Sequence, residues 1–205
     1  MIQPDPIVIV VDDDPSFLRS TERLIRTAGF NVKTFTSAEK FLRGTLPDVP
    51  ACLVLDVRLP GWSGLDLQRQ LAHVGLRVPI IFMTGHGDIP MSVQAMKAGA
   101  VEFLTKPFHK RDLLTAIEEA IERARVSRKE QAKLGELRSR YQSLTRRQRE
   151  VMAHVVAGMP NKRIASELGT TEQTIKFHRG HIMQKMLARS LAELVRTAAV
   201  LGIDS

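Results

Sequence analysis

The chain has 205 residues, of which 43% are hydrophobic and 25% are charged, and these ordinary globular values exclude wholesale disorder. No apolar run approaches the roughly 18 residues of a membrane span and no secretory signal pattern is visible, so we expect a cytoplasmic protein that does not engage membranes. The net charge of +8 resides in the C-terminal part, because residues 1–121 carry 13 Lys and Arg against 14 Asp and Glu. Such asymmetry indicates a polyanionic partner, although solvated helical faces would also produce it.

Apolar segments of strand length alternate with helical patterns from residue 7 to residue 125. The run at 52–55 is apolar on both faces, which is typical of a buried strand in a parallel sheet, and it leads into Asp56. Five successive βα units predict a doubly wound parallel α/β sheet. The expected strands are residues 7–11, 31–35, 52–55, 79–84 and 101–105, and the expected helices are residues 15–28, 37–43, 65–71, 91–98 and 112–125.

Charged and polar side chains stand at the carboxyl ends of four of these strands. Asp12 and Asp13 follow the first strand, and Asp56 ends the third. Thr84 ends the fourth strand and Lys106 follows the fifth. Open α/β sheets place their ligands at this edge, and clustered carboxylates without His or Cys suit Mg²⁺ (or Mn²⁺). An aspartate beside such an ion can accept a phosphoryl group, whose charge the lysine and the threonine hydroxyl would stabilise.

Residues 5–125 resemble the receiver domain of bacterial two-component response regulators. The resemblance implies that Asp56 is the phosphoacceptor, and that Thr84 and Lys106 contact the phosphoryl oxygens. It also implies a switch in which Thr84 moves and Phe103, a tyrosine in many relatives, turns inward. The matching segments are Val-Asp-Asp-Asp at 11–14, Leu-Asp-Val-Arg-Leu-Pro-Gly at 55–61, Met-Thr-Gly at 83–85 and Lys-Pro-Phe at 106–108. The implied metal ligands are Asp13, Asp56 and the main-chain carbonyl of Arg58, with Asp12 acting mostly through water.

The segment at 83–100 is similar to the FixJ-like subgroup, which pairs two phosphorylated receivers through the fourth helix and the fifth strand. His86 lies in this segment, and we interpret it as a loop residue over the phosphorylation pocket and not as a metal ligand. The resemblance further implies a cis peptide bond between Lys106 and Pro107, which an X-Pro bond permits.

Residues 126–143 form an expected helical linker between two domains, residues 1–125 and 144–205. Leu134, Leu137, Tyr141 and Leu144 follow one another at spacings of three, four and three, as in a short coiled coil. This stripe would either pack on its own chain or pair in a dimer. Gly135 costs helicity, so we allow for a bend there.

Residues 144–205 contain four helical patterns, of which the middle two have helix-turn-helix spacing. Thr145 with Gln148 and Ser190 with Glu193 predict capping boxes at the first and last of them. The third pattern is basic, and its polar side carries Lys176, His178, Arg179, His181 and Lys185. Such a helix suits the major groove of DNA.

The whole of this second region resembles the LuxR/NarL type of DNA-binding domain. The matching segments are Leu-Thr-Arg-Arg-Gln-Arg-Glu-Val at 144–151, Asn-Lys-Arg-Ile-Ala at 161–165, Thr-Ile-Lys-Phe-His-Arg at 174–179 and Arg-Ser-Leu-Ala-Glu-Leu-Val at 189–195. The resemblance implies that Lys176, Phe177 and position 180 face bases. Gly180 supplies no side chain there, which departs from the usual pattern. Lys162, Thr171, Thr174 and Arg179 would lie nearer phosphates.

The two resemblances together imply a FixJ/NarL-type response regulator of the bacterial cytoplasm, which is not an enzyme beyond its own Mg²⁺-dependent phosphorylation and dephosphorylation. A sensor histidine kinase would phosphorylate Asp56, and the resulting homodimer would bind promoter double-stranded DNA and act on RNA polymerase as an activator. Two other classes stay open: an aspartyl-phosphate phosphatase, and a receiver that drives a protein or RNA partner. The phosphatase usually has an Asp-x-Asp nucleophile after its first strand, whereas Asp56 follows the third.

Overall fold

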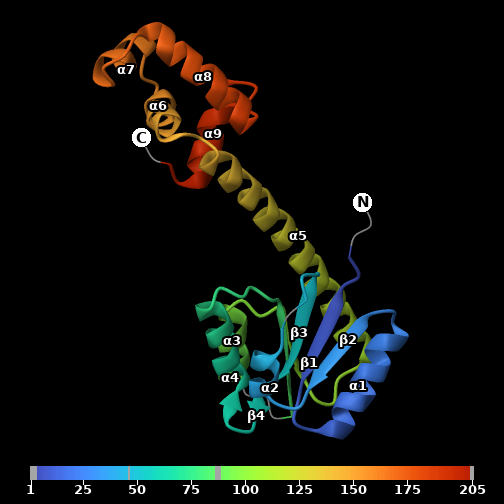
Figure 1. Cartoon of the computed structure of the whole chain (residues 1–205). Coiled ribbons are helices and arrows are strands. Elements are labelled where there is room, and N and C mark those ends of the chain that lie inside the picture. Colours follow the sequence, from blue (N-terminus) through green and yellow to red (C-terminus); the bar gives the residue numbers. More distant parts are fainter. Residues whose placement is uncertain (1–3, 46, 86–88, 204–205) are drawn as a thin grey trace. The chain divides into compact units, whose positions relative to one another are not determined.

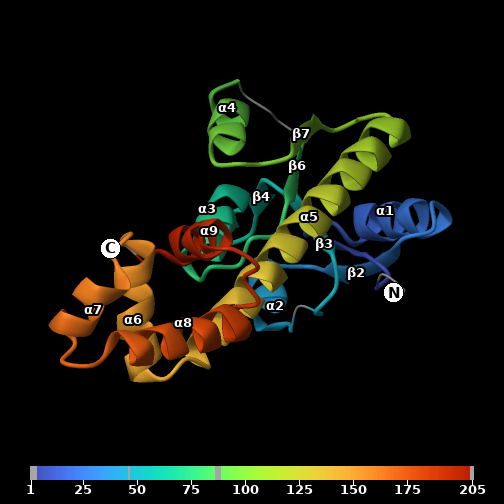
Figure 2. The ribbon, with the colours of Figure 1, turned by 90° about the horizontal axis from the view of Figure 1, so that it is seen from above.

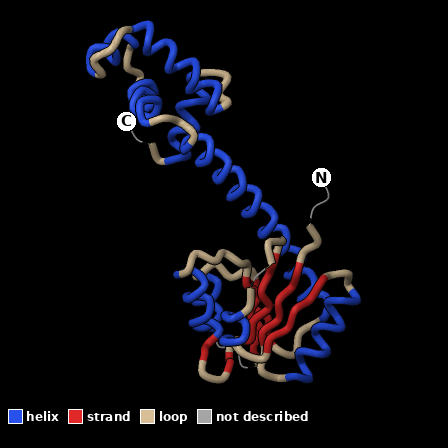
Figure 3. Tube along the Cα trace, viewed as in Figure 1, coloured by secondary structure: helices blue, strands red, loops and turns tan. Residues whose placement is uncertain are grey.

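The computed structural model describes residues 4–45, 47–85 and 89–203 (Figure 1). The chain divides into two compact units, Met1–Arg128 and Lys129–Ser205. The first unit contains every strand of the described chain, and the second is helical (Figure 3). Each unit has a hydrophobic core of its own.

The first unit is built on a five-stranded sheet in the order β2-β1-β3-β6-β7, in which all neighbouring strands are parallel. This confirms the predicted doubly wound α/β fold. The central strand, β3, is buried at every residue, as its uninterrupted apolar run predicted. The strands are β1 (Ile7–Val11), β2 (Asn31–Phe35), β3 (Ala51–Asp56), β6 (Ile80–Thr84) and β7 (Glu102–Thr105).

Helices cover both faces of this sheet (Figure 2). Successive side chains of a strand point to opposite faces, so Val8 and Val10 pack in one core layer and Ile9 and Val11 in the other. The first layer contains side chains of α1 (Pro15–Thr27) and of α5 (Lys110–Gln142), and the second contains side chains of α2 (Ala38–Arg43), α3 (Gly64–His73) and α4 (Ile89–Lys97).

The helix starts in this unit follow the sequence signals. The Asp14 side chain accepts hydrogen bonds from the backbone N–H groups of Ser16 and Phe17 and so caps α1. Ser63 and Asp66 form a capping box at α3. Both caps fix where a helix leaves the sheet, and thereby hold the loops at its carboxyl edge.

A small antiparallel pair that was not predicted follows β3. It consists of β4 (Arg58–Leu59) and β5 (Trp62–Ser63), joined through Gly61, whose φ is +75°. The chain then returns so closely to β3 that a Cβ atom on Gly64 would lie 2.6 Å from the Asp56 carbonyl oxygen. Glycine at 64 therefore permits the hairpin to fold against the end of the central strand.

Helix α5 is longer than expected. The predicted helix at 112–125 and the expected helical linker form one element, Lys110–Gln142, and Gly135 does not interrupt it. Within the first unit, Arg128 donates from Nη2 to the Asp48 side chain at 2.7 Å and to the Asp48 carbonyl oxygen at 3.0 Å. This contact ties residue 128 to the loop before β3.

The second unit contains the four predicted helices. Its core includes Leu144, and Tyr141 of α5 packs against that core. The end of the apolar stripe that begins at Leu134 therefore packs within its own unit. Thr145 and Gln148 form the predicted capping box. The second box is only half present, because Glu193 accepts from the N–H of Arg189 and not of Ser190. The helices are α6 (Arg146–Val156), α7 (Asn161–Glu167), α8 (Glu172–Met186) and α9 (Leu191–Leu201).

Candidate functional site

Three aspartates meet at the carboxyl edge of the sheet. Parallel pairing sets Val11 of β1 beside Leu55 of β3, which brings Asp12 and Asp13 next to Asp56. One carboxylate oxygen of each aspartate lies within 4.8 Å of the others. Asp12 and Asp56 are buried, whereas Asp13 is exposed. The sequence therefore predicted this cluster, but only the fold shows which of its members is open to solvent.

Lys106 bridges the two buried carboxylates. Its Nζ atom lies 2.5 Å from Oδ2 of Asp12 and 2.7 Å from Oδ2 of Asp56. The same ammonium lies 3.9 Å from the ring centre of Phe17, which adds a cation–π contact. Burial of the ammonium opposes its charge, but the hydrogen bonds that it donates to Asp12 and Asp56 outweigh burial, so the pKa of Lys106 is raised. Lys106 thus stays protonated and partly neutralises the cluster.

The carboxyl group of Asp12 holds its proton more readily than usual, because it is buried. Burial raises the pKa of its carboxyl above the ordinary value, while the contacts with Lys106 and with the N–H of Asp14 act in the opposite direction. The N–H of Asp14 donates to Asp12 Oδ1 at 2.9 Å, and the N–H of Arg58 donates to Asp56 Oδ1 at 2.8 Å. Each buried aspartate therefore has one oxygen fixed by the backbone and the other by Lys106.

The remaining predicted residues lie around this cluster. Thr84 is fully buried at the end of β6, and its carbonyl oxygen accepts from the N–H of Lys106 at 2.7 Å. Phe103 is half-buried on β7, and its ring centre lies 6.3 Å from that of Phe82. The peptide bond between Lys106 and Pro107 is cis, as expected. His86 lies outside the described residues, so its position beside the site stays a prediction.

The donor set fits a hard divalent cation. The three aspartates offer only oxygen atoms, which are the ligands that Mg²⁺ prefers. Arg58 reaches the cluster through its N–H, while the predicted metal contact concerns its carbonyl oxygen. Mg²⁺ beside the aspartates would offset the repulsion that burial creates between them.

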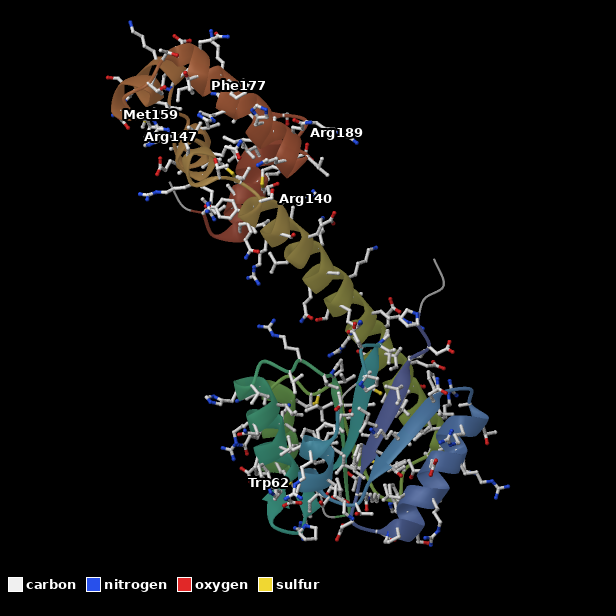
Figure 4. The ribbon with its side chains drawn as sticks, in the orientation of Figure 1. Trp62, Arg140, Arg147, Met159, Phe177 and Arg189 are labelled. Carbon is white, nitrogen blue, oxygen red and sulfur yellow. The ribbon has the colours of Figure 1, made fainter. Side chains whose placement is uncertain are left out.

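The second candidate site is the surface of α8. Lys176, Phe177 and Gly180 are exposed, as contact with DNA bases requires. Figure 4 labels Phe177 on α8. Lys176 Nζ lies 3.4 Å from Glu172 Oε1, an exposed pair that leaves the ammonium accessible. Lys162, near the start of α7, is also exposed. These residues were predicted from the family pattern, and the fold leaves all four open to a ligand.

Other polar residues of this unit form hydrogen bonds within the unit itself. Thr171 caps α8 by accepting from the N–H of Thr174, and the two hydroxyls lie 2.8 Å apart. Arg179 donates to Oδ1 of Asn161 at 2.8 Å, which joins α8 to the start of α7. Lys185 was expected on the polar side of this helix, but its side chain instead contacts other residues of the same unit. Its ammonium donates to the carbonyl oxygen of Ser143 and to Gln148 Oε1.

Comparisons with known proteins identify the family of each unit. Residues 8–118 match the family described as response regulator receiver domain, and residues 142–198 match the bacterial regulatory proteins of the luxR family. The chain therefore belongs to the two-component response regulators that join a receiver to a LuxR-type DNA-binding domain. This family consists of transcription regulators and not of catalytic enzymes. Among the described residues, no helix combines the length and the apolar character that crossing a membrane requires.

Individual relatives match over nearly the whole chain. Nodulation protein W of Bradyrhizobium diazoefficiens is 52% identical, over 97% of this chain and 88% of that protein. The transcriptional regulatory protein FixJ of Rhizobium meliloti is 43% identical, over 97% of both chains. Among solved structures, the response regulator StyR is 47% identical with a TM-score of 0.83, over 95% of this chain and 98% of that one.

Proposed function

We propose that Asp56 accepts a phosphoryl group from a sensor histidine kinase and that this event controls DNA binding. The observation that carries the proposal is the bridge from Lys106 to the Asp56 carboxylate, beside Asp12 and the exposed Asp13. A carboxylate oxygen of Asp56 would bond to phosphorus while the phosphorus–nitrogen bond of the phosphohistidine breaks. The receiver would thus catalyse only its own phosphorylation and dephosphorylation.

Each neighbour has a role in this proposal. Asp13, Asp56 and the Arg58 carbonyl oxygen would hold Mg²⁺ (or Mn²⁺), with Asp12 acting through water. The ion would supply positive charge beside the transferred group. Lys106, already a stable cation in contact with Asp56, would move onto the phosphoryl oxygens together with the Thr84 hydroxyl.

The proposed switch links the phosphoryl group to a dimer surface. Thr84 would move toward the phosphoryl group, and Phe103, which is half-buried, would turn further inward. Two receivers would then pair through α4 and β7. Three apolar side chains of α4 support this surface, because Ile89, Val93 and Met96 are exposed to 80%, 45% and 44%. Dimerisation would place two α8 helices on a promoter with two half-sites.

The proposed output is transcription activation through promoter double-stranded DNA and RNA polymerase, in the bacterial cytoplasm. Lys176, Phe177 and position 180 would face bases. Lys162, Thr171, Thr174 and Arg179 would face phosphates, with Arg179 oriented by its hydrogen bond to Asn161. We assign residues 1–125 to the receiver, 126–143 to the linker and 144–205 to the DNA-binding domain.

The test compares the wild type with Asp56→Asn after treatment with acetyl phosphate and Mg²⁺. Intact mass reports the adduct, light scattering reports the dimer, and DNA binding is measured on the same samples. We expect a phosphate adduct and a dimer in the wild type only. An adduct without a dimer would contradict the dimer switch while keeping Asp56, and an adduct of equal yield in Asp56→Asn would remove Asp56 as the acceptor.

A further inference from the structure

Phe177 is unusual among the aromatic residues of this chain. Its side chain is 64% exposed, and it is the one exposed aromatic side chain in the part of the chain that the structure describes. It lies on α8 (Figure 4), and its neighbour in the sequence, Lys176, is also exposed. A large apolar ring on an otherwise polar and basic helix surface indicates an apolar feature on the partner.

The Phe177 ring is held in place without being covered. The His181 ring, one turn further along α8, packs edge-to-face against it with ring centres 4.2 Å apart. Nδ1 of His181 donates to the carbonyl oxygen of Phe177 at 3.2 Å, which fixes the imidazole in this position. The phenyl ring therefore packs against a neighbour on its own helix, and its outer surface stays accessible.

Gly180 leaves an open space beside this ring. It lies three residues after Phe177, hence on the same side of α8, and it is exposed. A Cβ atom built on Gly180 would meet no described atom within 4 Å, and its φ lies outside the left-handed range. Neither packing nor backbone conformation in the free chain therefore requires glycine at 180. A helix-interior glycine nevertheless lowers helix stability relative to alanine.

We propose that Phe177 and Gly180 together recognise the C5-methyl group of a thymine in the major groove. This inference rests on the proposed DNA-binding function and gives it a base specificity. The thymine methyl is the apolar feature that base edges present in the major groove, so it is the feature that an uncovered phenyl ring selects. Gly180 brings the backbone of α8 close to the same base pair, because no side chain separates them.

The first experiment uses full-length protein and DNA duplexes that the protein itself selects from a random-sequence library. Each thymine of the selected half-site is then replaced singly by deoxyuridine, which removes only the methyl group. We expect one replacement to weaken binding about fourfold per half-site, the effect of removing one buried methyl. Phe177→Ala should bind the thymine duplex more weakly and should show no further loss with deoxyuridine.

Two results would overturn the methyl-recognition proposal. One is a wild type that tolerates deoxyuridine at every position, and the other is a Phe177→Ala variant that keeps the full wild-type loss. In both cases specific binding to selected duplexes would leave the DNA-binding function intact. Failure to select any duplex would instead contradict the proposed function itself, so the two failures are distinguishable.

The second experiment tests Gly180 with a matched control. Gly135 also lies inside a helix, and a Cβ atom there would meet no described atom within 4 Å. We expect Gly180→Ala and Gly135→Ala both to raise the thermal midpoint, since both add helix propensity. Only Gly180→Ala should weaken binding, by about fivefold or more, because its methyl intrudes on a close contact. Unchanged binding by Gly180→Ala would refute the close approach at this position.

Discussion

Lys106 Nζ lies 2.7 Å from Asp56 Oδ2 and so joins the end of β7 to the end of β3 across 50 positions of sequence. The same ammonium contacts Asp12, which makes it the internal counter-ion of two buried carboxylates. In the absence of metal, a single side chain therefore offsets part of the repulsion in the acidic cluster.

We expect Lys106→Met to lower the free energy of unfolding by about 3 kcal/mol in metal-free buffer, because it leaves two buried carboxylates without their cation. Added Mg²⁺ should restore more stability to the variant than to the wild type, since the ion then replaces the missing charge. Chemical denaturation with and without Mg²⁺ measures both effects. Lys97→Met, which changes an exposed lysine at the end of α4, is the control and should behave as wild type.

A second prediction concerns Arg179 and Asn161, which are joined by a hydrogen bond of 2.8 Å. Arg179→Met should reduce the salt dependence of DNA binding by one phosphate contact, a change of about 1 in the slope of log K against log salt. Asn161→Ala keeps the Arg179 charge but removes the hydrogen bond that orients it. This variant should therefore weaken DNA binding and leave the slope unchanged. Titrations at several salt concentrations separate the two cases. Equal slopes for the wild type and Arg179→Met would show that Arg179 acts only within the protein.

Lys185 should contribute to stability and not to DNA binding. Its ammonium donates to the Ser143 carbonyl oxygen at 2.9 Å and to Gln148 Oε1 at 3.1 Å. Lys185→Met should therefore destabilise the second unit by about 1 to 2 kcal/mol, as measured by hydrogen exchange of α6. The salt slope of DNA binding should stay at the wild-type value, whereas Lys162→Met should lower it. A lower slope in Lys185→Met would place this lysine on the DNA.

Glu150 makes the stability of the folded protein depend on pH. Its carboxylate accepts hydrogen bonds from Arg147 at 3.2 Å and from Arg146 at 3.1 Å. These contacts, that of Arg147 first, lower the pKa of Glu150 below its ordinary value of 4.5. The folded state then binds its proton less readily than the unfolded state does. The contribution to stability is complete above pH 4.5 and is lost as the pH falls through the lower folded pKa. Thermal unfolding of Glu150→Gln should consequently show a weaker decline on acidification than the wild type.

Cys52 provides a probe of unfolding in the first unit. Its side chain is fully buried in β3, and burial raises the pKa of the thiol to about 12. The thiolate that reacts with alkylating reagents is thus nearly absent at pH 8. We expect no labelling of the native protein and full labelling of this single cysteine in denaturant, as followed by intact mass. Rapid labelling under native conditions would contradict the burial of β3.

Much of the architecture was predictable because its signals are local. The apolar runs and the capping box at Thr145 depend on residues within a few positions of one another. The hairpin of β4 and β5 was missed because strands of two residues carry no periodicity. At Ser190 the expected box was half wrong, since the local backbone brings the Arg189 N–H to Glu193.

The sequence by itself determined the order of strands and helices and placed the candidate site residues at strand ends and on helix faces, because both follow from the order of apolar and polar residues. Only the tertiary structure decided which polar atoms meet. Lys106 reaches Asp12 across 94 positions, and Lys185 reaches Gln148 across 37. Such contacts depend on how strands align and how helices pack, which no local pattern encodes. Helix packing therefore decides that Lys185 is hydrogen-bonded within its unit and that the Phe177 side chain is exposed.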